Sequence, residues 1–337
     1  MKIAVIGLGR IGLMHARNLA QHKSVDQVLL VGRDSDRLKI ASVKVADQLA
    51  TDTEKAKLSS TLELEGAIVE SDGVLIASSS ASHPELVRKC IAHSRTTLVE
   101  KPLALELNEL ESLANEIEKS GTEVMVAFHR KYDPHFQALR QKVASGEVGT
   151  VRLVRSTALD HNGLNLDYIG SSGGVWRDML IHDFDLIPWV LGEKVISVQA
   201  FGAVLDEPTY AKFGDADTAV AVLEFESGAI ATVAGTRRNG AGQDVRLEIY
   251  GTKNTFSVGF DSHAPVTSIE SDGFHPQGIY EDFMDRFEPT FKAEVDHFIK
   301  LIKGQAQNLT SARDGLTSLR IAIAAEESRK SRMPVLL

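Results

Sequence analysis

The sequence predicts a two-domain α/β protein, in which a doubly wound parallel sheet precedes an α+β domain with a large, mostly antiparallel open sheet. Short β-branched runs alternate with helical patterns over about the first 125 residues, an order typical of parallel sheets with crossover helices. After Phe128 the apolar runs lengthen and alternate with polar residues, as in antiparallel strands. The 337 residues also exceed the roughly 250 to 300 at which single cores stop growing. We therefore expect domains at 1–125 and 126–337.

The first domain combines short strands with longer helices. Its β-branched runs predict strands at 3–6, 28–31, 73–77, 97–99 and 123–127. The apolar spacing between these runs predicts helices at 11–21, 36–49, 83–93 and 107–120. Ligands of such sheets bind at the carboxyl ends of the strands, so the loops after residues 6, 31, 77 and 99 are expected to carry the chemistry.

The second domain is expected to be built on an open sheet. Alternating runs predict strands at 151–158, 195–204, 218–225, 229–236 and 245–250. Turn residues at 227–228 and 239–242 separate the last three strands, which indicates an antiparallel meander. Two helices are expected at 283–303 and 312–328. Little helix is left to cover one broad face of the sheet, so we expect a second copy of the chain to cover it, in a homodimer or homotetramer.

Charge and hydropathy restrict the classes of partner that the chain is expected to bind. The formal net charge of −9 argues against nucleic acid, which requires a concentrated basic surface, and favours a small molecule or another subunit. Apolar runs stay far below the roughly 20 residues that span a bilayer, so no membrane partner is expected. Met1 and Lys2 lead directly into a strand pattern without an export signal, and Cys90 is the single cysteine, which together favour the cytoplasm. We expect Cys90 to be a packed thiol rather than a nucleophile.

A glycine pattern directly follows the first strand. The segment Gly7-Leu8-Gly9-Arg10-Ile11-Gly12 also opens the first helix, which is the context in which such a pattern binds a dinucleotide. The diphosphate would lie at the helix N-terminus, where free amides and the helix dipole attract an anion. The alternative is a glycine turn in an α/β protein of another function.

The end of the second strand bears on the choice between NAD and NADP. The place where a carboxylate would bind the ribose 2′-hydroxyl of NAD holds Gly32, and Arg33 follows it. A guanidinium there can bind a 2′-phosphate in a bidentate manner, so the dipeptide favours NADP. In the alternative interpretation, Asp34 binds the ribose and selects NAD, while Arg33 is only solvated.

Three side chains are candidates for acid/base chemistry. Asp178 and His182 are four residues apart in a helical pattern, a spacing that places both on one helix face, where a carboxylate can hold an imidazole. Lys101 follows a predicted strand at its carboxyl end, beside the expected nicotinamide position. Taken singly, the lysine is usually a loop residue and the Asp/His pair usually a surface pair. Pro188 is expected to kink or end the helix beyond His182.

A metal site is the other interpretation of this region. His182, Asp183 and Asp185, together with His161, are possible ligands. Helical spacing points Asp183 away from the face of Asp178 and His182, and the sequence contains neither an H-E-x-x-H motif nor a cysteine pair. We therefore expect no metal.

Taken together, these segments resemble the Gfo/Idh/MocA oxidoreductase family, which includes glucose-fructose oxidoreductase and inositol 2-dehydrogenase. The resemblance covers nearly the whole chain. Besides the glycine pattern, it is carried by the segments 77–83, Glu100-Lys101-Pro102, 127–134, 173–185 and Asp314-Gly315-Leu316.

The resemblance implies an N-terminal Rossmann domain that binds the cofactor and a C-terminal domain for substrate binding and oligomerisation. Lys101, Asp178 and His182 would form the catalytic set. His182 would accept the hydroxyl proton as hydride leaves for the nicotinamide, Lys101 would polarise the oxygen, and Asp178 would stabilise the imidazolium. The peptide bond before Pro102 is expected to be cis.

The resemblance also implies binding residues. The cofactor would contact Gly7, Gly9, Arg10, Ile11, Gly12, Arg33, Ser78, Ser79, Ser80, His83, Glu100, Lys101 and Arg130. The substrate hydroxyls would contact Lys101, His161, Asn162, Tyr168, Asp178, His182 and Asn239.

Two departures from the family pattern leave the substrate open. Many inositol dehydrogenases have asparagine where this chain has His129, and an Arg-Asp-Pro segment in place of the loop 159–163. We therefore expect an NAD(P)-dependent dehydrogenase that acts on a secondary hydroxyl of a cyclic polyol or sugar, similar to inositol 2-dehydrogenase. The alternatives are an NADPH-dependent reductase of a sugar ketone of the anhydrofructose type and a catalytically silent regulator that senses nucleotides.

Overall fold

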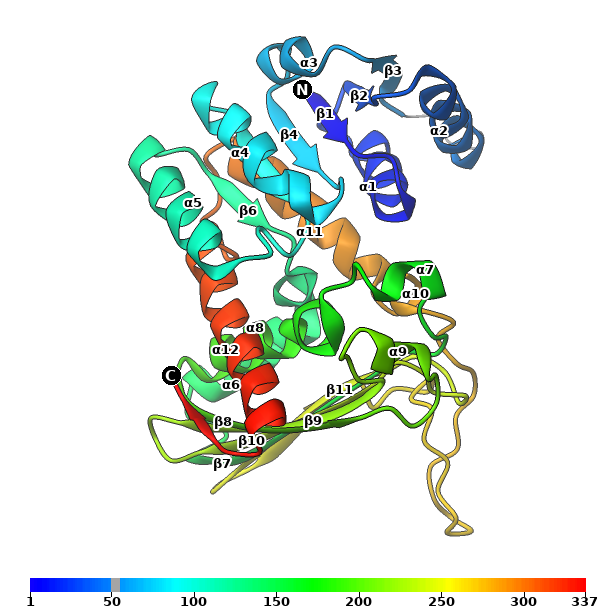
Figure 1. Cartoon of the computed structure of the whole chain (residues 1–337). Coiled ribbons are helices and arrows are strands. Elements are labelled where there is room, and N and C mark those ends of the chain that lie inside the picture. The colour runs from blue at the N-terminus through cyan, green and yellow to red at the C-terminus, as the bar shows by residue number, and fades with distance from the viewer. Residues whose placement is uncertain (50–54) are drawn as a thin grey trace. The chain divides into compact units, whose positions relative to one another are not determined.

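A computed structural model of the chain describes residues 1–49 and 55–337 (Figure 1). The chain forms two compact units. The first comprises Met1–Tyr132 and Pro289–Leu316, and the second comprises Asp133–Glu288 and Thr317–Leu337. A segment near the C-terminus thus belongs to the first unit, which local sequence patterns do not reveal. The expected domain boundary at 125/126 stays a prediction.

The first unit contains a six-stranded parallel sheet in the order β3-β2-β1-β4-β5-β6. Its strands are β1 (Lys2–Ile6), β2 (Gln27–Val31), β3 (Lys57–Thr61), β4 (Gly73–Ile76), β5 (Thr96–Val99) and β6 (Val124–Val126). This sheet confirms the predicted doubly wound fold. The sequence analysis missed β3 because this edge strand, Lys-Leu-Ser-Ser-Thr, has no fully buried residue and therefore lacks an apolar run.

Helices connect and cover this sheet. They are α1 (Arg10–Ala20), α2 (Ser35–Gln48), α3 (Leu64–Glu70), α4 (His83–Ala92), α5 (Leu107–Ser120) and the short turns η1 (Ser80–Ser82) and η2 (His129–Tyr132). From Pro289 onward, α11 (Glu288–Ile302) also belongs to this unit. It packs closely on β4, since a Cβ atom at Gly73 would lie 2.4 Å from the side chain of Ile302. Cys90 is completely buried, in agreement with a packed thiol.

The predicted helix at 283–303 is interrupted. It consists of α10 (Phe283–Arg286) and α11, and Phe287 between them has a non-helical conformation. Pro289 lies in the first turn of α11, where its missing amide costs no helical hydrogen bond, so a new helix can begin at this proline.

The second unit contains a seven-stranded sheet in the order β12-β11-β7-β10-β9-β8-β13. Its strands are β7 (Val151–Leu159), β8 (Val195–Ala203), β9 (Thr218–Phe225), β10 (Ile230–Thr236), β11 (Asp244–Gly251), β12 (Thr255–Val258) and β13 (Val335–Leu336). The predicted meander is wrong between β10 and β11, because β7 lies between them, parallel to β10 and antiparallel to β11. Turn residues mark where strands end, but they do not determine which strands pair.

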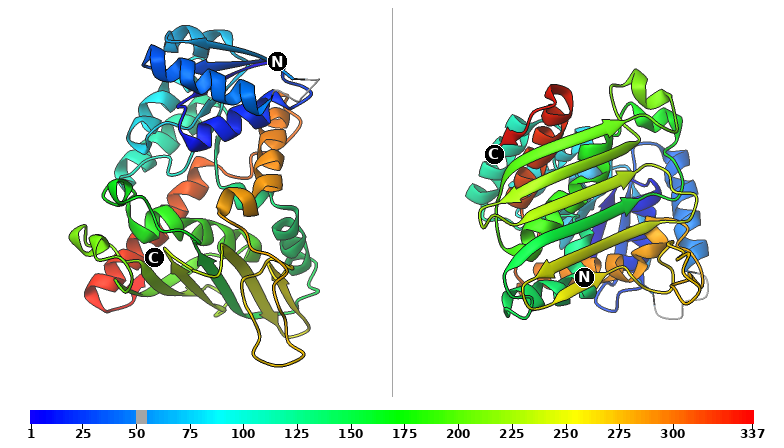
Figure 2. Two further views of the ribbon diagram at one scale, coloured as in Figure 1. Left: turned by 90° about the vertical axis from the view of Figure 1, so that its right-hand side faces the viewer. Right: turned by 90° about the horizontal axis from the view of Figure 1, so that it is seen from below.

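The two faces of this sheet differ. The helices α6 (Pro134–Ala144) and α8 (Ile181–Leu191) and residues 317–331 of α12 (Ala312–Ser331) lie over one face (Figure 1). Seen from below, no helix of the described part of the second unit covers the other face (Figure 2). That face exposes apolar side chains from four strands, namely Leu153, Phe201, Val220, Val222 and Ile230.

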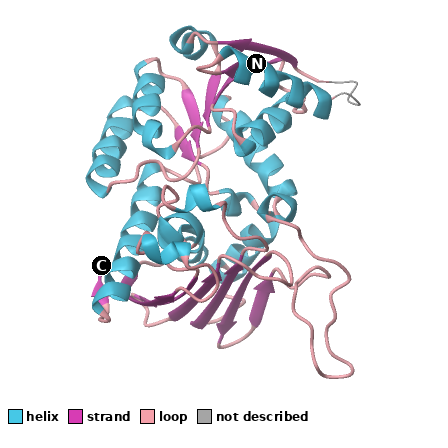
Figure 3. Cartoon of the chain, turned by 45° about the vertical axis from the view of Figure 1, so that its right-hand side comes forward, coloured by secondary structure: helices cyan, strands magenta, loops and turns pink. Residues whose placement is uncertain are grey.

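Shorter elements and one long loop complete the second unit. The short helices are α7 (Leu166–Ile169), α9 (Thr209–Lys212) and the π-helix η3 (Val175–Met179). The loop 259–282, between β12 and α10, contains neither helix nor strand (Figure 3). Of the helices in the described part of the chain, none has the length and hydropathy to span a membrane.

Candidate active site

The glycine loop after β1 has the geometry of a diphosphate-binding turn. Gly7 has φ +93° and lies so close to the loop after β4 that a Cβ atom would approach Ser78 N to 2.4 Å. At Gly12 a Cβ atom would lie 2.0 Å from Gly7 O, so α1 packs directly on this turn. A Cβ atom at Gly9 would meet nothing within 4 Å. Gly9 caps α1 without a side chain, and the first turn holds no acidic residue, so this helix end fits an anion.

Arg33 and Asp34, which follow β2, are the two candidates for contact with the cofactor ribose, and the structure places them differently. Asp34 accepts hydrogen bonds from Asp36 N (3.1 Å) and Arg37 N (2.9 Å) and thereby caps α2. Arg33 is exposed. A ribose contact by Asp34 would have to share the capping carboxylate, whereas the Arg33 side chain is accessible to a phosphate.

His83 connects the loops that follow β4 and β5. The side chain is almost completely buried, with Nδ1 2.8 Å from Pro102 O and Nε2 3.1 Å from Ser78 O. Burial lowers the pKa of His83, and a neutral imidazole donates from only one nitrogen. The predicted cofactor residue His83 thus contacts the backbone of two loops. In the first of these loops, the Ser82 hydroxyl donates to Ser79 O (2.7 Å).

The Glu100-Lys101-Pro102 loop is held from α1. The Lys101–Pro102 peptide bond is cis, which confirms the expectation from the resemblance. Glu100 Oε1 lies 2.9 Å from Nε2 of His15, a completely buried residue of α1 that the sequence analysis did not select. The carboxylate next to Lys101 is therefore bonded to the helix that begins at the glycine turn.

Arg130 lies in a buried turn, η2. The neighbouring Lys131 forms an ion pair with Asp314 at 3.1 Å, and His129 stacks on Phe291 with ring centroids 4.7 Å apart. Asp314, from the start of α12, thus fixes the segment that carries Arg130.

Asp178 and His182 do not lie on one regular α-helix, so the predicted helix is wrong in this part. Asp178 lies in η3, whose i→i+5 hydrogen bond runs from Leu180 N to Val175 O (2.9 Å), and His182 lies in the first turn of α8. Gly173 and Gly174 have φ +90° and +83°, and Asp215 Oδ1 accepts from Val175 N (2.8 Å) to cap η3. The turn that follows these glycines is a π-turn, which is wider than an α-helical turn, so α-helical spacing does not apply to Asp178. Beyond His182, α8 contains Pro188 and ends at Leu191.

Two side chains fix the carboxylate of Asp178. Arg237 Nη1 donates to Oδ2 at 2.8 Å, and the Tyr168 hydroxyl donates to Oδ1 at 3.4 Å. Arg237 is 2% exposed. Burial lowers the pKa of Arg237, but Asp178, Asp160 and Asp215 raise it by more, so the net shift is upward. Arg237 was not among the predicted site residues. It directly follows β10, and a charged residue at a strand end is the signal that could have identified it.

The loop 159–163, which was expected to contact the substrate, is anchored by Gln243 and by Glu281 near the end of the long loop 259–282. His161 Nδ1 lies 3.0 Å from Glu281 O, and His161 N donates to Gln243 Oε1 at 3.2 Å. Asn162 Nδ2 donates to the same Glu281 carbonyl at 3.5 Å. Asn239 donates to Gly242 O at 2.8 Å within its own turn. Tyr168 is 45% exposed, and its hydroxyl contacts Asp178.

Asp183 and Asp185 lie in the protein interior. Asp183 is completely buried and accepts from Ser156 Oγ at 2.6 Å, while Asp185 contacts Ser318 Oγ at 3.4 Å. Among residues 1–49 and 55–337, no group of three or more His, Cys, Asp or Glu side chains is arranged to hold a metal ion.

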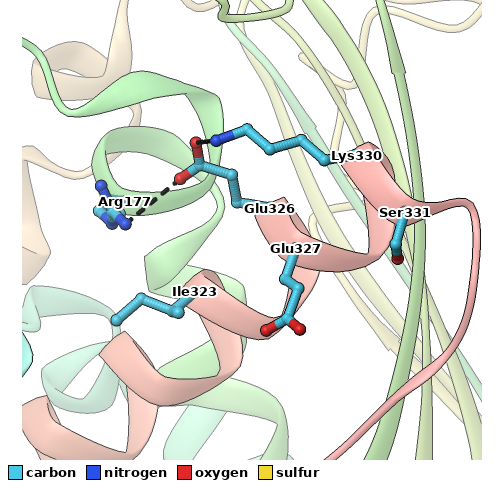
Figure 4. A pocket seen from close by; sticks show the side chains of 6 residues that line it. All are labelled: Arg177, Ile323, Glu326, Glu327, Lys330 and Ser331. Carbon is cyan, nitrogen blue, oxygen red and sulfur yellow. Dashed lines mark hydrogen bonds and ion pairs between the residues drawn. The ribbon is translucent and has the colours of Figure 1, made fainter.

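An open hollow of about 530 Å³ lies elsewhere on the second unit (Figure 4). Its described lining residues are Arg177, Ile323, Glu326, Glu327, Lys330 and Ser331. Arg177 and Lys330 both pair with Glu326, at 3.3 and 2.7 Å. Its charges are mixed and none of the predicted catalytic residues lines it, so we do not assign it to the substrate.

Comparisons with known proteins agree with this fold. Residues 1–128 match the oxidoreductase family with an NAD-binding Rossmann fold, and residues 136–257 match the GFO/IDH/MocA C-terminal domain. The chain is 34% identical to myo-inositol 2-dehydrogenase of Thermotoga maritima, covering 100% of this chain and 98% of the relative. It is 30% identical to scyllo-inositol 2-dehydrogenase (NAD(+)) of Bacillus subtilis, covering 100% and 96%. A crystal structure of a probable dehydrogenase from Thermotoga maritima superposes with a TM-score of 0.88 at 32% identity, covering 100% and 99%.

Proposed function

The chain belongs to the GFO/IDH/MocA oxidoreductase family, and from that premise we propose that it transfers hydride between a nicotinamide cofactor and a secondary hydroxyl of a cyclic polyol or sugar. Full-length similarity to two inositol 2-dehydrogenases makes inositols the first substrates to test. The observation that carries the proposal is the carboxylate of Asp178, fixed by Arg237 and Tyr168 four residues before His182.

The first unit would hold the cofactor. The diphosphate would lie at the α1 N-terminus, where Gly9 leaves open space and no acidic residue of the first turn repels it. The bound nicotinamide accepts or supplies the hydride. The other cofactor contacts would come from Arg10, Ile11, Arg33, Ser78, Ser79, Ser80, Glu100, Lys101 and Arg130. His83 would hold the two loops that carry five of these residues.

Three side chains would handle the proton and the oxygen. In the oxidation direction, neutral His182 accepts the proton of the substrate hydroxyl as its carbon gives up hydride. Asp178 stabilises the imidazolium that results, and Lys101 polarises the developing carbonyl. His161, Asn162, Tyr168 and Asn239 would bind the remaining hydroxyls, which need paired donors and acceptors.

We propose that Arg33 makes the enzyme prefer NADP. The supporting observations are the absence of a side chain at Gly32, the exposure of Arg33 and the use of Asp34 as a helix cap. The name of the Bacillus subtilis relative specifies NAD(+), so both cofactors must be compared. We expect Arg33→Ser to lower kcat/KM with NADP by about tenfold, equal to about 1.4 kcal/mol, and to leave NAD little changed. A wild-type preference for NAD would contradict this proposal.

The function is tested by following cofactor absorbance with a panel of inositols, glucose, xylose, galactose and their ketones, with NAD and NADP. We expect oxidation of at least one cyclic polyol, and at least about a 100-fold loss of turnover in His182→Asn with cofactor affinity retained. Consumption of NADPH on dicarbonyl sugars alone would favour the anhydrofructose-type reductase. Cofactor binding without any turnover would favour a regulator.

We propose that the uncovered face of the second unit's sheet binds a second copy of the chain, within a homodimer or homotetramer in the cytoplasm. The apolar side chains exposed on β7 to β10 support this arrangement. Val222→Glu together with Phe201→Glu should convert the oligomer to a monomer in sedimentation experiments. A monomeric wild-type protein would exclude it.

A further inference from the structure

Arg237 is a buried cation with an incomplete set of hydrogen bonds. Its amide donates to Asp217 O at 2.7 Å, which fixes the backbone directly after β10. Its Nη1 donates to Asp178 at 2.8 Å, whereas Nε and Nη2 are buried without a hydrogen-bond partner among the described residues. A guanidinium selected only for stability would satisfy more of its five donors.

The groups that face Arg237 come from several elements of the second unit. Asp160 follows β7, Asp215 follows α9, and Asp178 lies in η3. Two of these carboxylates also have partners elsewhere, since Asp160 accepts from Gln243 at 3.1 Å and Asp215 caps η3. The phenol of Tyr210 in α9 is also close enough for Arg237 to oppose the rise of its pKa that burial causes. Asp178 receives a hydrogen bond from the guanidinium, at 2.8 Å.

We infer that Arg237 is a positioning residue that holds Asp178 ionised and in one orientation for proton transfer at His182. The inference rests on the proposed function, which places Asp178 beside the imidazole during the reaction. The bond from Arg237 fixes Oδ2 at 2.8 Å, and the Tyr168 hydroxyl contacts Oδ1 at 3.4 Å. A positive charge at this distance favours the ionised carboxylate, and a charge-assisted hydrogen bond restricts its rotation.

The test compares Arg237→Met and Arg237→Lys with Arg238→Met. Arg238 is the matched control, because it is adjacent, equally charged and 64% exposed, with only a 3.6 Å pair to Asp206. In Arg237→Met we expect kcat to fall by about 100-fold and the acid limb of kcat/KM to move upward by about one pH unit or more, while the dissociation constant of the cofactor stays within about twofold. Arg237→Lys should return the acid limb toward the wild-type position. Arg238→Met should match the wild type.

A second readout does not depend on turnover. Carbon-13 NMR of aspartate-labelled protein, with the Asp178 signal assigned through Asp178→Asn, follows this carboxyl directly across the same pH range. We expect it to protonate at higher pH in Arg237→Met than in the wild type. A wild-type pH profile and an unchanged Asp178 titration in Arg237→Met would overturn the inference. If the wild-type protein oxidised none of the polyols, the NMR shift would still decide the role of Arg237, and only the proposed function would fail.

Discussion

The imidazole Nε2 of His15 lies 2.9 Å from Oε1 of Glu100, and His15 is completely buried. This pair joins the helix that starts at the glycine turn to the loop that carries Lys101. The imidazole also packs edge-to-face with Phe291 of α11, with ring centroids 5.9 Å apart. Two predicted parts of the cofactor site are thus linked inside the first unit by a residue that was not itself predicted to bind the cofactor.

Replacing His15 should destabilise the first unit. His15→Phe keeps a ring of similar size but leaves the partly buried Glu100 without this partner, so we expect the free energy of unfolding to fall by about 1–3 kcal/mol in urea titrations. Glu100→Gln serves as the second arm of a double-mutant cycle. Purely additive effects of the two substitutions would show that the pair contributes no coupling.

Alanine substitutions at Gly9 and Gly12 should have different effects, one on cofactor affinity and the other on thermal stability. Gly9→Ala places its Cβ in open space and should leave the melting temperature nearly unchanged, while cofactor affinity falls by about tenfold or more because the methyl group occupies the diphosphate position. Gly12→Ala would press on Gly7 O at 2.0 Å and should lower thermal stability. Calorimetry of binding and thermal melts measure both. Unchanged affinity in Gly9→Ala would place the diphosphate elsewhere.

Glu294 should make stability depend on pH. It is completely buried in α11, and burial, followed by the charge of Glu100, raises its pKa well above 4.5. Because the folded state binds the proton more tightly, its stabilising contribution is complete below about pH 4.5 and is lost as pH rises toward the folded pKa. Glu294→Gln cannot ionise, so its advantage over the wild type should grow by up to about 1.4 kcal/mol per pH unit in this window.

Urea titrations between about pH 5 and pH 8 measure this difference. Glu63→Gln, at an exposed position of the same unit, is the control and should show no growing difference. A constant difference between Glu294→Gln and the wild type would mean that Glu294 is already ionised in the folded state over the whole range, and it would contradict the raised pKa.

Cys90 should be unreactive in the native protein. Burial is the main cause that raises the pKa of its thiol to about 11, so little thiolate forms near neutral pH. We expect a thiol reagent to label Cys90 slowly in buffer and rapidly in denaturant. Rapid labelling of the folded protein would show that α4 opens readily.

Local patterns in the sequence were sufficient for the parallel sheet, the glycine turn and most helices. Alternating strands and helices can form only a few topologies with a parallel sheet. A glycine pattern directly between a strand and a helix predicts a specific tight turn. The roles of Lys101, Asp178 and His182 came from several motifs considered together, and they remain proposals. The position of β7 between β10 and β11 did not follow from the sequence, because strand pairing depends on the whole sheet.

The sequence by itself determined that Asp178 precedes His182 by four residues, directly after a glycine entry. Only the tertiary structure decided that this entry forms a π-turn capped by Asp215 and that Arg237, 59 residues further along the chain, holds the carboxylate. A helical pattern reports spacing along one segment. The charge environment of a carboxylate depends on groups from distant segments, which meet only when the sheet and its loops are assembled.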